Sequence, residues 1–183
     1  GFKKYGYKIV KLEDGHPVRA GKKSIRFEVR EGDCGNDPGK WNDCKKDRQR
    51  HELSGDRFNG KAWYAYSIYL PKDFKSVDPV KSAMGQFHQK GSWPTLMFQI
   101  NDDGYYVDRQ LHGMTRELKK ILTLDDMKGK WNDILIHINS TKKDSGFYKI
   151  WVNDKLKYEY NGQVSKGKEN FFKFGIYQTY VSS

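Results

Sequence analysis

Three short segments of the sequence each offer a stripe of polar side chains to one face of an extended strand. The segments are residues 48–53 (RQRHEL), 86–88 (QFH) and 171–178 (FFKFGIYQ). Side chains two residues apart in a strand share a face, so Gln86 points the same way as His88, and Lys173 the same way as Tyr177. An amide, an imidazole, an ammonium group and a phenol on one surface suit the removal of a proton next to a carboxylate. The pattern therefore favours an enzyme over a β-domain without catalysis.

The first segment adds three charged side chains of matching parity, namely Arg48, Arg50 and Glu52. Arg50 has the planar guanidinium that grips a carboxylate through two hydrogen bonds. His88 is the candidate base, because a neutral imidazole with a pKa of about 6.5 is present near neutral pH. The site requires that the three strands be neighbours in one sheet, which the sequence alone does not show.

The rest of the chain is dominated by alternating apolar and polar residues, which are typical of half-buried β-strands. Further strands are expected at residues 25–29, 61–70, 95–100, 105–111, 131–139, 147–152, 156–160 and 171–180. Asn153-Asp154 separates two of them and predicts a tight hairpin turn. Only residues 114–127 have a helix-like rhythm, and their 121–124 stretch fits a strand equally well. About ten short strands separated by turns predict an all-β sandwich or jelly roll in a single domain over residues 1–183.

The formal net charge of +11 predicts a polyanionic partner. Nucleic acid and acidic polysaccharide both fit that charge, but the chain has no helix-turn-helix, zinc-finger or RNA-recognition motif, so nucleic acid is not expected. No apolar run approaches the roughly 18–20 residues of a membrane span, so no membrane association is expected. Asp102-Asp103 and Asp125-Asp126 are the candidates for a structural calcium site, but they are more typical of turns. No metal or other cofactor is predicted.

Cys34 and Cys44 are the two cysteines of the chain, and both lie in one loop rich in glycine and aspartate. Two thiols this close in an otherwise cysteine-free chain predict a disulfide in a secreted or periplasmic protein. The alternative is two free thiols in a cytosolic protein; a zinc site is disfavoured, since structural zinc usually has four Cys or His ligands. The sequence opens at Gly1 rather than methionine, which is what removal of a signal peptide would leave.

The three polar segments resemble the signature strands of jelly-roll polysaccharide lyases. Alginate lyases of that fold carry, in the same order, an Arg-x-Glu-Leu strand, a Gln-x-His strand and a Tyr-Phe-Lys-Ala-Gly-x-Tyr strand. Other stretches are similar to the heparin-lyase-like and glucuronan-lyase-like branch. These are residues 17–19 (PVR), 26–30 (RFEVR), 32–35 (GDCG), 41–44 (WNDC), 66–71 (YSIYLP) and 129–133 (GKWND). Phe171, Phe174 and His51 depart from the alginate-lyase pattern, which favours another uronate polymer over alginate.

The resemblance implies β-elimination at a uronate. A base takes the C5 proton, the 4-O-glycosidic bond breaks, and a 4,5-unsaturated uronate remains. Arg50 and Gln86 would neutralise the carboxylate next to C5, because that carbon is not acidic while its neighbour is charged. His88 would be the base and Tyr177 the acid toward the leaving oxygen, although in some relatives one tyrosine does both.

Four further residues complete the expected substrate-binding set, namely Lys173, Arg48, Glu52 and His51. Lys173 would meet the anionic groups of the substrate. Glu52 is expected to orient Arg50 or Arg48, and His51 fits an ordinary structural role as well.

The expected partner is an anionic polysaccharide, and the chain is expected to be a monomer. A glucuronan-like polymer is the first expectation for the substrate, followed by alginate or a glycosaminoglycan. The alternative is a non-catalytic carbohydrate-binding module for acidic polysaccharide. A glycoside hydrolase is disfavoured, because hydrolysis needs two facing carboxylates about 5–9.5 Å apart and the motif strands hold only Glu52.

Overall fold

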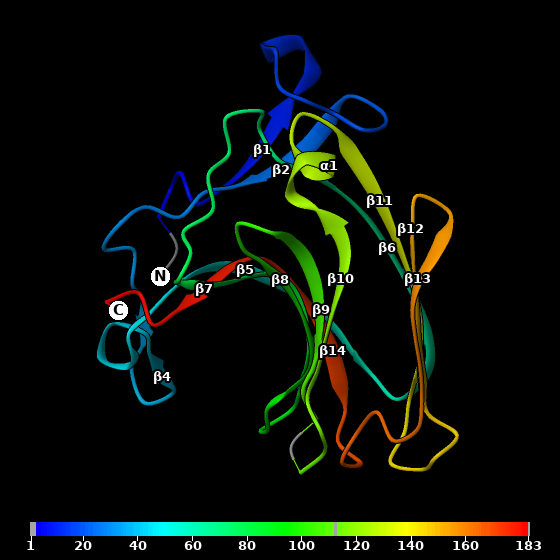
Figure 1. The fold of residues 1–183 in the computed structure, drawn as a ribbon. Coiled ribbons are helices and arrows are strands. Elements are labelled where there is room, and N and C mark those ends of the chain that lie inside the picture. Colours follow the sequence, from blue (N-terminus) through cyan, green and yellow to red (C-terminus); the bar gives the residue numbers. More distant parts are fainter. Residues whose placement is uncertain (1–2, 112, 183) are drawn as a thin grey trace.

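Two antiparallel sheets pack face to face in the computed structural model, which describes residues 3–111 and 113–182 (Figure 1). The larger sheet has six strands in the order β10 (Glu117–Thr123), β9 (Gly104–Arg109), β8 (Pro94–Ile100), β7 (Lys81–Gln89), β14 (Asn170–Thr179) and β5 (Arg48–Phe58). The smaller sheet has four, in the order β13 (Lys155–Asn161), β12 (Phe147–Val152), β11 (Trp131–Ser140) and β6 (Gly60–Tyr69).

Short elements lie before and between these strands. Two small ribbons pair β1 (Tyr7–Lys11) with β2 (Lys23–Phe27), and β3 (Asn36–Asp37) with β4 (Trp41–Asn42). The described helices are single turns, namely η1 (Leu12–Asp14), η2 (Cys44–Lys46) and α1 (Leu124–Met127). No helix among residues 3–111 and 113–182 is long and apolar enough to cross a membrane.

The core lies between the two sheets and follows from the alternation of the strands. In β11, Ile134, Ile136 and Ile138 are buried, while the residues between them turn outward. Phe87 and Phe172 are buried on the other side of the core, with ring centroids 4.9 Å apart. Burying one large apolar side chain contributes about 1.5–3 kcal/mol, so these positions fix which face of each strand turns inward. The predicted all-β jelly roll is confirmed.

The structure decides two local predictions, the turn at Asn153-Asp154 and the helix-like rhythm of residues 114–127. Asn153 and Asp154 have positive φ angles of 48° and 64° and join β12 to β13, which confirms the hairpin turn. Residues 114–127 are mostly not helical, because residues 117–123 pair with β9 as strand β10, which confirms the strand alternative over 121–123. Only the last four of them, in α1, form a helix, which Thr123 caps by accepting a hydrogen bond from the backbone N–H of Asp126.

The face of the six-stranded sheet that turns away from the core carries the polar stripes. Its strands bend around that outer face (Figure 1). Since inward positions are filled by core side chains, the residues between them, including the predicted site residues of β5, β7 and β14, are left to the outer face.

Candidate active site

The three polar segments lie on adjacent strands, as a shared site requires. β14 pairs with β7 on one side and with β5 on the other. The register sets Lys173 opposite Gln86, and Tyr177 opposite Arg50. Directly opposed residues of antiparallel strands share a face, so these four side chains belong to one surface.

Gly175 lies between Lys173 and Tyr177 and stands opposite Glu52. Its φ is +130°, and a Cβ atom there would lie 2.2 Å from the backbone oxygen of His51. Because β14 approaches the backbone of β5 so closely, glycine is needed at this position of the motif.

Glu52 is a buried carboxylate that connects the three strands. Its Oε1 accepts a hydrogen bond from Nε2 of Gln86 at 2.6 Å, and its Oε2 accepts one from Nζ of Lys173 at 2.7 Å. Nη1 of Arg50 lies 3.7 Å from Oε2. The Glu52 side chain is only 2% exposed, so it orients these donors rather than meeting a substrate itself. Its burial contradicts the prediction that Glu52 belongs to the substrate-binding set and leaves it the orienting role toward Arg50.

Arg50 is held by a carboxylate of the protein itself. It donates from Nε to Oδ2 of Asp43 at 2.6 Å and from Nη2 to Oδ1 at 2.5 Å. Its guanidinium also lies 4.7 Å from the ring centroid of Tyr177 and 5.3 Å from that of Trp41. The edge formed by Nε and Nη2 is therefore taken by Asp43. Arg50 can reach a ligand only with the N–H groups that remain, chiefly those on Nη1.

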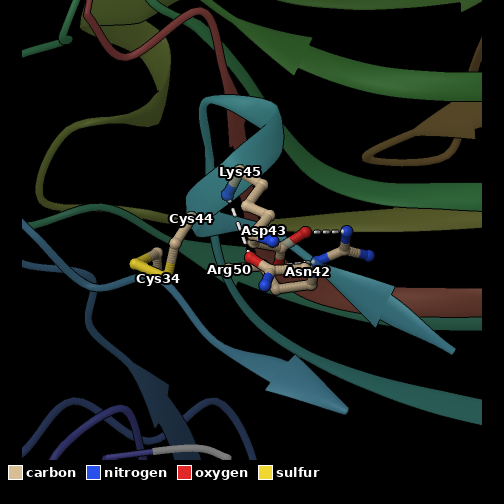
Figure 2. Close-up of a disulfide and its surroundings, with 6 residues drawn as sticks. All are labelled: Cys34, Asn42, Asp43, Cys44, Lys45 and Arg50. Carbon is tan, nitrogen blue, oxygen red and sulfur yellow. Dashed lines mark hydrogen bonds and ion pairs between the residues drawn. A yellow bond between two sulfur atoms is a disulfide. The ribbon is translucent and has the colours of Figure 1, made fainter. Parts of the chain in front are cut away.

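The disulfide anchors the loop that carries Asp43 (Figure 2). Cys34 and Cys44 are joined with their Cα atoms 5.0 Å apart, which confirms the predicted bridge. Asp43 directly precedes Cys44, and its backbone N–H donates to the carbonyl oxygen of Gly35 at 2.9 Å. The carbonyl oxygen of Asp43 accepts from the N–H of Arg48 at 3.1 Å. The loop is thus attached to the disulfide on one side and to the start of β5 on the other.

His88 has the geometry of a neutral base. Its Nδ1 lies 2.9 Å from the carbonyl oxygen of Gln89, and since a carbonyl can only accept, Nδ1 carries the hydrogen. In the neutral ring Nε2 is then the atom with the available lone pair. Burial lowers the pKa of His88, and the positive charges of Lys173 and Arg50 lower it further against the opposing effects of the Gln89 carbonyl and Glu52. The imidazole therefore stays neutral to a lower pH than a free histidine.

Tyr177 has the properties of a proton donor. Burial raises its pKa, and this effect outweighs the nearby guanidinium groups of Arg48 and Arg50, which lower the pKa. Arg48 lies 6.0 Å from the centroid of the ring. The phenol is therefore protonated at neutral pH, which suits an acid better than a base.

His51 lies outside this surface. Neighbouring residues of a strand point to opposite faces, so His51, between Arg50 and Glu52, turns the other way. It is 2% exposed, and its Nδ1 is 2.6 Å from the carbonyl oxygen of Glu28. This position contradicts the prediction that His51 binds substrate.

The site has more positive than negative charge. Three cations, Arg48, Arg50 and Lys173, share the surface with two carboxylates, Asp43 and Glu52. A negatively charged ligand would balance the remaining charge. Within the part of the chain that the structure describes, no group of three or more His, Cys, Asp or Glu side chains could hold a metal ion.

Sequence reasoning did not assign a role to Asp43 or Trp41. Trp41 lies in the two-residue strand β4 and Asp43 directly after it, and a strand this short gives no alternation to interpret. The available signal for Asp43 was its place directly before Cys44, because a disulfide fixes the residue next to it.

The jelly roll thus brings His88, Tyr177 and a cationic surface together on one face of the six-stranded sheet. A family model described as polysaccharide lyase matches residues 12–183, so the chain belongs to the polysaccharide lyase family and is an enzyme of that class. No curated protein sequence matches the chain significantly.

Solved structures share the fold at low sequence identity. The endo-β-1,4-glucuronan lyase of the fungus Trichoderma reesei superposes with a TM-score of 0.66 and 16% identity, covering 96% of this chain and 77% of that one. Alginate lyase AlyC3 superposes with a TM-score of 0.55 and 15% sequence identity, covering 73% of this chain and 66% of that one. The family 18 polysaccharide lyase aly-SJ02 superposes with a TM-score of 0.53 and 14% sequence identity, covering 72% of this chain and 61% of that one. These likenesses establish the fold, and the family match establishes the class of enzyme.

Proposed function

We propose that this enzyme cleaves a uronic-acid-containing polysaccharide by β-elimination, with a glucuronan-like polymer as the first candidate substrate and alginate or a glycosaminoglycan next. One observation carries the proposal: Gln86, His88, Lys173 and Tyr177 share a sheet face around the buried Glu52 carboxylate. The glucuronan lyase, whose architecture matches nearly all of this chain, supports the first substrate.

The first task of such a site is to neutralise the substrate carboxylate beside C5. Lys173 uses one of its three N–H groups on Glu52 and has two left for a ligand. Arg50 has its Nη1 hydrogens, whereas Gln86 is only 2% exposed and serves the site by holding Glu52 in place. Donors fixed in advance, in a partly buried site, stabilise the enolate-like charge that develops when C5 loses its proton.

The second task is proton transfer. Nε2 of His88 takes the C5 proton, the electron pair forms the C4–C5 double bond, and the bond from C4 to O4 breaks. The Tyr177 hydroxyl gives its proton to O4, and water then restores both side chains. The directions of the two pKa shifts support this division, since His88 is kept neutral and Tyr177 is kept protonated.

The direct test is incubation of the protein with a panel of glucuronan, alginates and glycosaminoglycans. Elimination creates an unsaturated uronate, which we expect to detect by its ultraviolet absorbance, most strongly with glucuronan. Reducing ends that form without the absorbing product would indicate hydrolysis and contradict the proposal.

The pH dependence of elimination should report the lowered pKa of His88. His88 acts as a base only when neutral, so kcat/KM should fall on acidification with an inflection below the ordinary value of about 6.5. Lys173→Met removes a positive charge that lowers this pKa, so its inflection should move to higher pH. A pH series of kcat/KM for both proteins measures the two inflections. An inflection that stays in place in Lys173→Met would contradict the assignment of His88 as base.

We also propose that the protein is secreted or periplasmic, because a disulfide persists in oxidising compartments. A monomeric state, and the absence of nucleic-acid and membrane partners, remain predictions from the sequence.

A further inference from the structure

A second buried carboxylate on the six-stranded sheet gathers the same three kinds of group as Glu52. Asp108 of β9 has a side chain that is 0% exposed. Arg116 donates to it twice, from Nε to Oδ1 at 2.7 Å and from Nη2 to Oδ2 at 2.9 Å. Gln99 of β8 donates its amide N–H to Oδ2, and Nζ of Lys81 of β7 lies 3.7 Å from the same oxygen. An arginine, a lysine and an amide thus surround Asp108 as they surround Glu52.

The strand register places the two clusters on one surface. Gln86 of the Glu52 cluster stands opposite Met97 of β8, and Met97 stands opposite Asp108 on its other side. Opposed residues share a face, so Asp108 turns toward the same outer face as Gln86. Neighbouring strands lie about 4.7–4.9 Å apart, which puts Asp108 about 10 Å across the sheet from Gln86. One extended ligand lying across the strands would pass over both clusters.

The Asp108 cluster has an excess of positive charge that solvent can reach. Two cations share one carboxylate, and the Arg116 and Lys81 side chains are 55% and 30% exposed. Burial lowers the pKa of Lys81, and the charge of Arg116 adds to this effect against the opposing effect of Asp108. Asp108 is too buried to meet a ligand, so its role is to hold the two cations in place. A further anion would relieve their mutual repulsion.

We propose that Arg116 and Lys81 form a second carboxylate-binding subsite, which holds another uronate of the polymer whose reacting sugar lies between His88 and Tyr177. This inference rests on the proposed function. Arg116 offers the N–H groups that Asp108 leaves unused, and Lys81 offers a point charge beside them. Because the subsite contains neither an acid nor a base for the reaction, it acts on the affinity for the polymer and leaves the chemical step unchanged.

The test is Arg116→Gln, measured as kcat and KM on the preferred uronate polymer. Losing charged hydrogen bonds to one bound carboxylate should raise KM about tenfold or more with kcat unchanged. The matched control is Arg19→Gln. Arg19 also donates two hydrogen bonds to one aspartate, Asp133, at 3.0 and 2.7 Å, and is 51% exposed. It lies in the loop between β1 and β2, and Asp133 belongs to β11 of the other sheet. The control should keep the wild-type KM.

A second variant, Lys81→Met, should raise KM in the same direction and guards against a folding defect in Arg116→Gln. Oligosaccharides of increasing length add a further readout. The shortest cleaved oligomers should be processed equally by wild type and Arg116→Gln, and the two should diverge once an oligomer spans both clusters.

An active wild type whose KM is unchanged by both substitutions would show that Asp108 holds only a structural ion pair; the proposed function would then stand without the subsite. A wild type inert on every uronate polymer would instead overturn the proposed function. In that case equilibrium binding of the same polymers tests whether the subsite exists. If Arg116→Gln binds the polymers as tightly as wild type does, the subsite is rejected.

Discussion

Tyr177→Phe should abolish nearly all elimination activity while the protein stays folded and still binds its polymer. The substitution removes only the hydroxyl that we propose as the proton donor to the leaving oxygen. The ring that lies beside the Arg50 guanidinium remains. General acid catalysis is worth about 10²–10⁴ in rate, so the loss should appear in kcat with little change in KM. Steady-state kinetics of the unsaturated product, together with equilibrium binding of the polymer, measure the two effects separately.

The matched control for this prediction is Tyr106→Phe. Tyr106 is on the same sheet, and its hydroxyl donates to Asp103 instead of facing the His88 site. That variant should keep the wild-type kcat. Wild-type turnover in Tyr177→Phe would exclude the phenol as the acid. A wild-type chain that binds uronate polymers without cleaving any of them would favour the carbohydrate-binding module.

The strands themselves could be predicted because their signal is local. Alternating burial in β11 and the Asn153-Asp154 turn both depend on residues a few positions apart. Residues 114–127 were harder, since β10 exists by pairing with β9 and a helical rhythm cannot reveal such a partner. The order of the strands is also a long-range property. The contact between Lys173 and Glu52 joins residues 121 positions apart.

The site could be predicted only where strand parity decides the face of the sheet to which a side chain points. Parity pairs Gln86 with His88 and Lys173 with Tyr177 within their own strands, and the same rule argues against His51, which follows Arg50 directly. That these strands are neighbours of β5 is shown only by the fold. Parity says nothing about loops, which is why the partner of Arg50 was missed. The sequence offered Arg50 to a substrate carboxylate, and the structure shows that Asp43 already occupies its Nε and Nη2.

Asp43→Asn should reduce both stability and turnover, because it breaks the ion pair that fixes Arg50. The Asp43 side chain is 1% exposed and that of Arg50 is 21% exposed, so Asp43→Asn leaves a largely buried guanidinium without its charged partner. Removing one partner of a buried pair costs about 3–5 kcal/mol of stability. Misplacing a substrate-positioning group by an ångström can cost about 10²-fold in rate, and we expect a fall in kcat of that order. Denaturant unfolding and steady-state kinetics measure the two losses.

Asp133→Asn is the matched control, since Asp133 also accepts two hydrogen bonds from one arginine but is 47% exposed. Exposed pairs are worth about 0–1 kcal/mol, so its stability should change little and its kcat not at all. A kcat in Asp43→Asn equal to that of the control would show that Asp43 does not position Arg50.

The disulfide should act on turnover through the same aspartate. Replacing Cys34 and Cys44 together by serine removes a bridge worth about 2–3 kcal/mol and frees the loop that holds Asp43. We expect kcat to fall in this variant, because Arg50 then loses its fixed partner. In the Asp43→Asn background the same replacement should lower kcat little further, since residues that act as one unit are not additive. Losses of kcat that multiply independently would mean that the disulfide reaches the site by another route.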